Sequence, residues 1–184
     1  MQRINSINGI SLEFIQSVLK IDENSPTGLT WLPRNSPQWN GKHANKTAGY
    51  KEISKKDGYT CFRVTVTYNE KSFSLLCSRI IFLLHNHYLT DGKTIDHIDG
   101  NSLNNKISNL REVTILENSY NRKQSSNNTS GDSGVSWCEA AKSWMVRIGY
   151  KKERKYFGCF KDKNDAIKFN LETRKKLYGK FHRD

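Results

Sequence analysis

The stretch that decides the fold runs from Thr94 to Arg122 and reads T-I-D-H-I-D-G-N-S-L-N-N-K-I-S-N-L-R-E-V-T-I-L-E-N-S-Y-N-R. Its Asp99-Gly100 pair is a dipeptide typical of hairpin turns. Residues 109–114 predict a short strand. Thr114-Ile115-Leu116-Glu117 then has the Ser/Thr-x-x-Glu form of a capping box, which predicts a helix from Thr114. The stretch is therefore expected to fold as strand, loop, strand and helix.

Four polar residues of this stretch fall on those predicted elements. Asp96 and His97 are adjacent, Asn109 follows His97 by twelve residues, and Asn118 follows Asn109 by nine. With D-H-I-D-G-N, then N-N-K-I-S-N-L-R, then an asparagine on the helix, the stretch resembles the HNH nuclease family. The resemblance is to the homing-type endonucleases of phages and bacteria, whose core is a hairpin and a helix around one metal ion.

The resemblance implies a role for each of these residues. Asp96 and Asn118 are expected to hold one divalent metal ion, Mg²⁺ or alternatively Mn²⁺, since hard cations prefer oxygen ligands. His97 is expected to be the general base, and Asn109 to hold the second ring nitrogen of His97. Arg111, beside the site, is predicted to hold a phosphate. Adjacent strand residues point to opposite faces, so placing Asp96 and His97 in one site follows from the resemblance and not from periodicity.

Composition limits the class of protein and its partners. The chain has 184 residues and a net charge of +12, which favours a polyanionic partner such as double-stranded DNA. Its four cysteines stand alone without a C-x-x-C pair, which argues against a zinc ribbon and a disulfide scaffold. No apolar run is long enough to span a membrane. We expect a cytoplasmic protein of a bacterial or phage-infected cell, with no membrane contact and no small-molecule cofactor.

The residues before the motif are predicted to form an extension of hairpin and helix. Alternating apolar residues from Tyr59 to Tyr68 indicate a half-buried strand, with Phe62, Val64, Val66 and Tyr68 on one face. The other predicted elements are a helix at Leu12–Ile21, a strand at Leu29–Leu32, a polar loop at Pro33–Thr47, a returning strand at Ser72–Leu76 and a buried helix at Ser78–Leu89.

A second unit follows residues 124–133, a polar stretch predicted to be a linker. Residues 134–184 hold 14 Lys and Arg against 6 Asp and Glu, so they carry +8 of the net charge. A helix at Lys163–Tyr178 is expected to cover one face of a sheet, which leaves Arg147, Arg154 and Tyr156 on the other face as DNA contacts. The predicted strands are Gly134–Cys138, Ser143–Tyr150 and Lys155–Phe160.

This unit resembles a second family through G-V-S-W, W-M-V-R-I, R-K-Y-F-G-C-F and D-A-I-K-F. The family is the Apetala-two, or ethylene-response-factor, type of plant DNA-binding domain, which reads the major groove with its sheet. Where the plant domains have arginines after G-V, this chain has Ser136 and Cys138. The base preference of that family is therefore not carried over.

Together these observations predict an α+β protein. It combines an HNH ββα-metal core and N-terminal extension (1–123, core about 76–123), a linker (124–133) and a three-stranded antiparallel sheet backed by one helix (134–184). The expected activity is metal-dependent cleavage of DNA at a recognised site, of homing or nicking type. The alternatives are a dimeric restriction-type enzyme, a DNA-binding protein without catalysis, and cleavage of RNA. A monomer and a homodimer both stay open.

Overall fold

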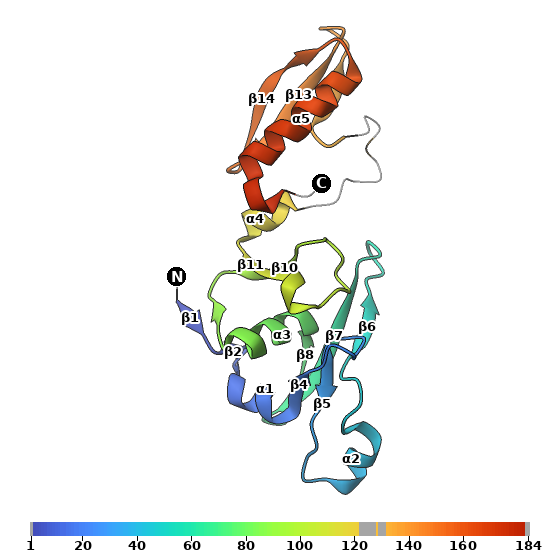
Figure 1. Cartoon of the computed structure of the whole chain (residues 1–184), viewed down its shortest axis with the longest axis vertical. Coiled ribbons are helices and arrows are strands. Elements are labelled where there is room, and N and C mark those ends of the chain that lie inside the picture. Colours follow the sequence, from blue (N-terminus) through green and yellow to red (C-terminus); the bar gives the residue numbers. More distant parts are fainter. Residues whose placement is uncertain (1, 122–127, 129–131, 183–184) are drawn as a thin grey trace. The chain divides into compact units, whose positions relative to one another are not determined.

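The computed structural model describes residues 2–121, 128 and 132–182. Helices and several small sheets are mixed along the chain, which confirms the mixed α and β content that the sequence predicts. The chain divides into two compact units, Met1–Thr114 and Ile115–Asp184 (Figure 1). The predicted linker lies mostly outside the described residues. Within the described ranges, no helix has both the length and the apolarity needed to cross a bilayer.

The first unit has one three-stranded antiparallel sheet, in which β7 lies between β6 and β8. Val64 and Val66 of β7 are buried, as the alternation predicts. The sheet strands are β6 (Tyr50–Ile53), β7 (Thr60–Tyr68) and β8 (Lys71–Leu76). The other strands pair in antiparallel twos: β1 (Arg3–Ile4) with β9 (Leu89–Thr90), β2 (Ser6–Ile7) with β3 (Ile10–Ser11), β4 (Leu19–Ile21) with β5 (Leu29–Trp31), and β10 (Thr94–His97) with β11 (Leu110–Val113).

Helix α3 (Cys77–Asn86) lies at the centre of this unit's core (Figure 1). Ile80, Ile81 and Leu83 are each at most 1% exposed, and burying a side chain of this size stabilises a fold by about 1.5–3 kcal/mol. The helix contacts α1 (Leu12–Val18), strands β7 and β8, and both strands of the β10–β11 hairpin. It is therefore the support against which the motif hairpin packs.

Two sequence predictions in the first unit are wrong at their edges. The helix predicted to run to Ile21 ends at Val18, because residues 19–21 leave it to pair with β5 as strand β4. The loop predicted at Pro33–Thr47 contains α2 (Pro37–His43), which begins with proline in its first turn and the Ser36 hydroxyl as its cap. At residues 19–21, pairing with β5 overrides the helical pattern of the sequence. At α2, the Ser36-Pro37 pair is a local signal for a helix start that the loop prediction leaves out.

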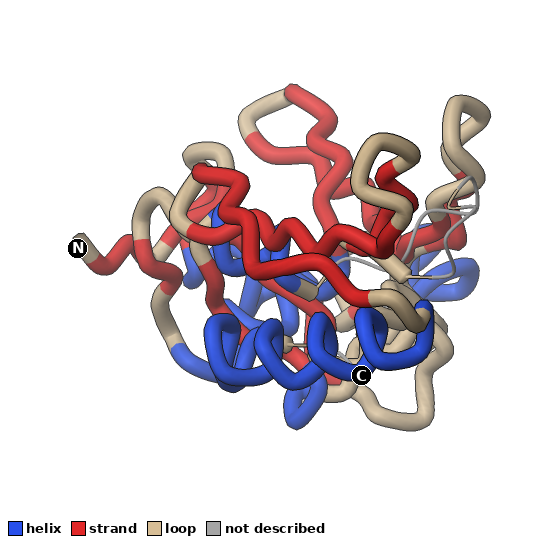
Figure 2. The backbone as a smooth tube through the Cα atoms, turned by 90° about the horizontal axis from the view of Figure 1, so that it is seen from above, coloured by secondary structure: helices blue, strands red, loops and turns tan. Residues whose placement is uncertain are grey.

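The second unit is a three-stranded antiparallel sheet in the order β12-β13-β14, with α5 lying along one face (Figures 1 and 2). Asp162 caps α5 through the backbone N–H groups of Asn164 and Asp165, and Gly179 ends it. The elements are α4 (Ile115–Tyr120), β12 (Val135–Cys138), β13 (Ser143–Tyr150), β14 (Glu153–Phe160), α5 (Lys163–Tyr178) and the 3-10 turn η2 (Gly179–Phe181).

The core of this unit lies between the sheet and α5. Val146 and Ile148 of β13 meet Ala166 of α5, and all three are at most 2% exposed. The aromatic ring of Tyr120, from α4, stacks on Tyr178 at a centroid distance of 4.2 Å. Helix α4 therefore packs within this unit.

Candidate functional site

The motif hairpin brings its polar residues to fixed places in the first unit. Strand β10 pairs with β11 so that Asp96 lies opposite Arg111 and His97 lies opposite Leu110. The pairing extends one residue further, because the Ile98 N–H donates to the Asn109 carbonyl at 2.9 Å. His97 thus stands at the end of a regular ladder, where the chain leaves the strand and begins the loop of residues 98–106.

Asp96 and Arg111 form an ion pair across the hairpin. Arg111 Nη2 lies 2.8 Å and Nε 2.9 Å from Asp96 Oδ2. The side chains are 16% exposed for Arg111 and 8% for Asp96, so little water screens the pair. Directly opposite residues of a ladder share one face, which explains why these two meet. The predicted metal ligand and the predicted phosphate contact are therefore bonded to each other.

His97 has a different partner, in the loop that follows it. Its Nε2 lies 3.0 Å from Asn105 Oδ1. Asn105 Nδ2 donates in turn to the Thr27 carbonyl at 3.0 Å. His97 is 9%, Asn105 7% and Thr27 2% exposed, so the whole chain of contacts is buried. Thr27 lies between β4 and β5, in the N-terminal part of the unit and far from the motif in sequence.

The loop between the hairpin strands is held by Asp99. Its carboxylate accepts from Asn104 Nδ2 at 2.7 Å, from the Asn101 N–H at 2.7 Å and from Asn109 Nδ2 at 2.9 Å. Burial raises the pKa of Asp99, but these three hydrogen bonds and the nearby His97 outweigh it, so the pKa is lowered. Asp99, Asn101 and Asn104 therefore shape the loop through these contacts.

The remaining predicted site residues are placed as follows. Asn109 Oδ1 accepts from the Asp99 N–H and Asn109 Nδ2 also donates to the Asn104 carbonyl, so in the described part of the chain its bonds end within the loop. The His97 ring contacts Asn105 through Nε2, and the role of Asn109 at the second ring nitrogen stays a prediction. Asn118 is carried by α4, in the second unit. Its assignment as a ligand therefore depends on the resemblance alone.

A metal ion would find oxygen ligands of the right kind in the first unit. The Asp96 carboxylate is a hard anionic donor, which suits Mg²⁺ or Mn²⁺. Within residues 2–121, 128 and 132–182, no group of three or more His, Cys, Asp and Glu side chains is arranged to hold a metal.

The second unit exposes the basic face that the sequence predicts. Arg147 of β13 pairs directly with Tyr156 of β14, and Arg154 pairs with Gly149 two rungs along. All three predicted contact residues are exposed, Tyr156 by 59%. The Tyr156 hydroxyl donates to Cys159 Sγ at 3.3 Å, and this hydrogen bond lowers the pKa of the Cys159 thiol. The face therefore presents cations and a polar aromatic ring together.

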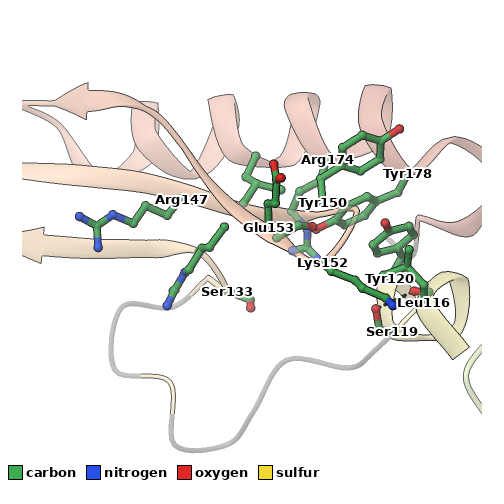
Figure 3. Close-up of a pocket in the computed structure, with 14 residues that line it drawn as sticks. Leu116, Ser119, Tyr120, Ser133, Arg147, Tyr150, Lys152, Glu153, Arg174 and Tyr178 are labelled. Atoms are coloured by element: carbon green, nitrogen blue, oxygen red, sulfur yellow. Dashed lines mark hydrogen bonds between the residues drawn. The ribbon is translucent and has the colours of Figure 1, made fainter.

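A cavity of about 560 Å³ adjoins this face within the second unit (Figure 3). Figure 3 shows three tyrosine rings gathered at one end of it and Arg147 at the other. The tyrosines are Tyr120, Tyr150 and Tyr178, and the charged residues are Arg147, Lys152, Glu153, Arg154 and Arg174. A smaller cavity of about 280 Å³ lies in the first unit, beside Gly28 and Asn105. Neither cavity is lined by Asp96 or His97.

Comparison with known proteins places the motif in a family. A family model described as HNH endonuclease matches residues 76–120. Protein 3.8 of Escherichia phage T7 is 37% identical over 92 residues, which cover 50% of this chain and 75% of that protein. No solved structure gives a significant match.

Proposed function

Since the chain belongs to the same family as Protein 3.8 of Escherichia phage T7 and carries an HNH endonuclease domain at residues 76–120, we propose that it is a metal-dependent DNA endonuclease. The observation that carries the proposal is the buried His97, which stands at the end of β10 beside the carboxylate-bearing Asp96 and makes a hydrogen bond to an amide. This arrangement provides a base and an anionic metal ligand on consecutive residues. The activity is hydrolysis of phosphodiester bonds at a recognised site, of homing or nicking type.

Each residue has a defined task in this mechanism. His97 takes a proton from the attacking water, because an imidazole can accept a proton on its unprotonated ring nitrogen. Asp96, with Asn118 assigned by resemblance, would hold one Mg²⁺ or Mn²⁺, which supplies a positive charge for the phosphate and the leaving oxygen. Asn109 fixes the loop that follows His97. Arg111 turns from Asp96 to a DNA phosphate when DNA binds.

The second unit is proposed to position the enzyme on double-stranded DNA. Arg147 and Arg154 take part in none of the ion pairs found between described residues, so their guanidinium groups are available to a polyanion. Tyr156 lies beside Arg147 and offers a ring and a hydroxyl to the same groove. An Apetala-two type of docking, with the sheet in the major groove, is the corresponding hypothesis. The protein would act in the cytoplasm of the bacterial or infected cell, where its DNA is.

The alternative functions predict different products in a plasmid-cleavage assay. A dimeric restriction-type enzyme would produce linear plasmid through two coordinated cuts, whereas a monomer with one site produces nicked circles first. A DNA-binding protein without catalysis would shift DNA on a gel and cut neither strand. Incubation of the protein with supercoiled plasmid and with an RNA of equal length separates all of these cases.

Removal of divalent metal is expected to abolish cleavage and leave DNA binding largely intact. EDTA should stop the conversion of supercoiled to nicked plasmid, and added Mg²⁺ or Mn²⁺ should restore it. Because Asp96 is the only carboxylate assigned to the ion, much of its coordination comes from DNA and water. Calorimetry is therefore expected to find weak Mg²⁺ binding by the free protein. Undiminished cleavage in EDTA would contradict the metal requirement.

Replacing Arg147 and Arg154 together with glutamine is expected to weaken DNA binding at least tenfold. A phosphate contact that is lost from each position lowers the slope of log K against log salt by about 0.9 per contact, so the double variant should lower it by about 2. If either arginine reads a base instead, its loss costs about 1–3 kcal/mol and relaxes specificity at that position. Fluorescence anisotropy at several salt concentrations measures both quantities.

The matched control for this double variant is Lys168→Gln with Lys176→Gln. These lysines lie on exposed positions of α5, so the control removes the same charge from outside the sheet face. We expect it to change affinity far less than the arginine variant. Equal losses in the two double variants would mean that net charge, and not the sheet face, provides the affinity.

A further inference from the structure

The buried contact between His97 and Asn105 fixes which ring nitrogen carries the proton. Asn105 lies between two partners, the imidazole of His97 and the backbone carbonyl of Thr27. A backbone carbonyl only accepts hydrogen bonds, so the Asn105 NH₂ group must face Thr27. The amide oxygen of Asn105 then faces His97 Nε2 at 3.0 Å.

An amide oxygen also only accepts, so the His97 nitrogen that it faces must be a donor. Nε2 therefore carries the proton in the neutral ring, and Nδ1 carries the lone pair. When Nδ1 takes a proton from water, an O–H bond breaks, an Nδ1–H bond forms, and the ring becomes an imidazolium. Its Nε2–H still donates to the same amide oxygen, so Asn105 holds the ring before and after the transfer.

Asn105 is itself held in place from outside the matched HNH segment. The Thr27 hydroxyl donates to the Ala48 carbonyl at 2.6 Å, so the turn that carries Thr27 is tied to residues near β6. The turn can approach this closely because Gly28 has no side chain. A Cβ at Gly28 would lie 2.7 Å from Ile81 Cδ1 and 3.5 Å from Asn105 Cβ, and its φ of +81° also favours glycine.

We propose that Asn105 is the positioning residue of His97: anchored by Thr27, it fixes the orientation of the ring and its Nε2–H tautomer. The assignment of a catalytic use to Nδ1 rests on the proposed endonuclease function, whereas the tautomer does not. The N-terminal extension is then a structural part of the active site, because its residues 25–30 hold the group that orients the base.

Nitrogen-15 NMR of the full chain labelled on histidine tests the tautomer directly. The ring-nitrogen shifts, recorded at mildly alkaline pH, show which nitrogen carries the proton. Among the five histidines, the signals of His97 are those absent from a His97→Ala sample. We expect a single Nε2–H form with a slowly exchanging ring proton. In Asn105→Ala that proton should exchange fast, and some Nδ1–H form should appear. A wild-type ring protonated on Nδ1 would overturn the proposal.

Two further variants separate positioning from loop stability. Asn104→Ala removes a neighbouring hydrogen bond to Asp99 without touching His97, so the His97 ring proton should stay slow. Asn105→Asp keeps an oxygen acceptor for Nε2–H and should keep the Nε2–H form. If Asn104→Ala frees the ring proton as much as Asn105→Ala does, Asn105 acts only through the loop, and the proposal is overturned.

Cleavage kinetics supply the second readout. With Mg²⁺ and plasmid, Asn105→Ala is expected to lower kcat about tenfold or more, with KM for DNA unchanged, because orientation of the base matters only in the reacting complex. A lower kcat with a matching rise in KM would point to a disturbed DNA surface instead. If the wild-type protein cleaves no DNA, the proposed function fails while the NMR result still decides the role of Asn105.

Discussion

Cleavage of DNA by a His97→Ala variant is expected to be about 10²- to 10⁴-fold slower than by the parent chain, the range over which a general base contributes to catalysis. The buried imidazole of His97, beside Asp96 on the hairpin, is the proposed base, and alanine can take no proton from water. DNA affinity should change little, since the proposed binding face lies in the second unit. Single-turnover cleavage of supercoiled plasmid, together with anisotropy on the same DNA, measures both effects.

The control for this variant is His85→Ala, which removes an exposed histidine near the end of α3. It should cleave DNA at the parent rate. A thermal melt of each variant shows whether the loss of activity comes from unfolding, because His97→Ala also deletes the buried bond to Asn105. Full activity in a folded His97→Ala chain would remove the base from the proposed mechanism.

The secondary structure near the motif was predictable because its signals are local. The Asp99-Gly100 turn, the capping box at Thr114 and the alternation in Tyr59–Tyr68 each act within a few residues, and the corresponding elements are present. In the second unit α5 begins and ends where the sequence predicts, between the local cap Asp162 and Gly179. Signals of this kind fail when a distant strand competes, as β5 does for residues 19–21.

The partner of His97 was not predictable from spacing. Asn104 and Asn105 are adjacent asparagines in one loop, and the sequence contains nothing that tells which of them turns inward. The choice depends on Thr27, which is 78 residues away from Asn105 and contributes only a backbone carbonyl. A carbonyl is present at every residue, so no residue type could have marked it.

The second largest effect is expected at Arg111, on stability. Replacing Arg111 with methionine keeps much of the side-chain length and removes the ion pair with Asp96. Because both side chains of the pair are at most 16% exposed, the Asp96 carboxylate stays buried after the change. Breaking a buried pair by removing one partner typically costs about 3–5 kcal/mol. Chemical denaturation of the metal-free protein should show a loss in this range.

Lys155→Met is the matched control, since Lys155 pairs with Glu153 at 3.5 Å where the side chains are 53% and 70% exposed. A pair of that kind contributes about 0–1 kcal/mol, so the control should lose little stability. A double-mutant cycle with Asp96→Leu isolates the pair, and Asp96→Leu with Arg111→Met should be more stable than Arg111→Met alone. Equal stability of the double variant and of Arg111→Met would mean that the Asp96 carboxylate is not destabilising after Arg111 is removed.

Magnesium connects this stability effect to the proposed chemistry. Both guanidinium contacts of Arg111 fall on Asp96 Oδ2, so the proposed metal ion would compete with Arg111 for that oxygen. Removing Arg111 removes this competition, so Mg²⁺ should stabilise Arg111→Met more than the parent at equal concentration. The same metal should leave the Asp96→Leu double variant unchanged. If Mg²⁺ raises the stability of all three chains equally, it binds somewhere other than Asp96, and the metal ligand has to be sought elsewhere.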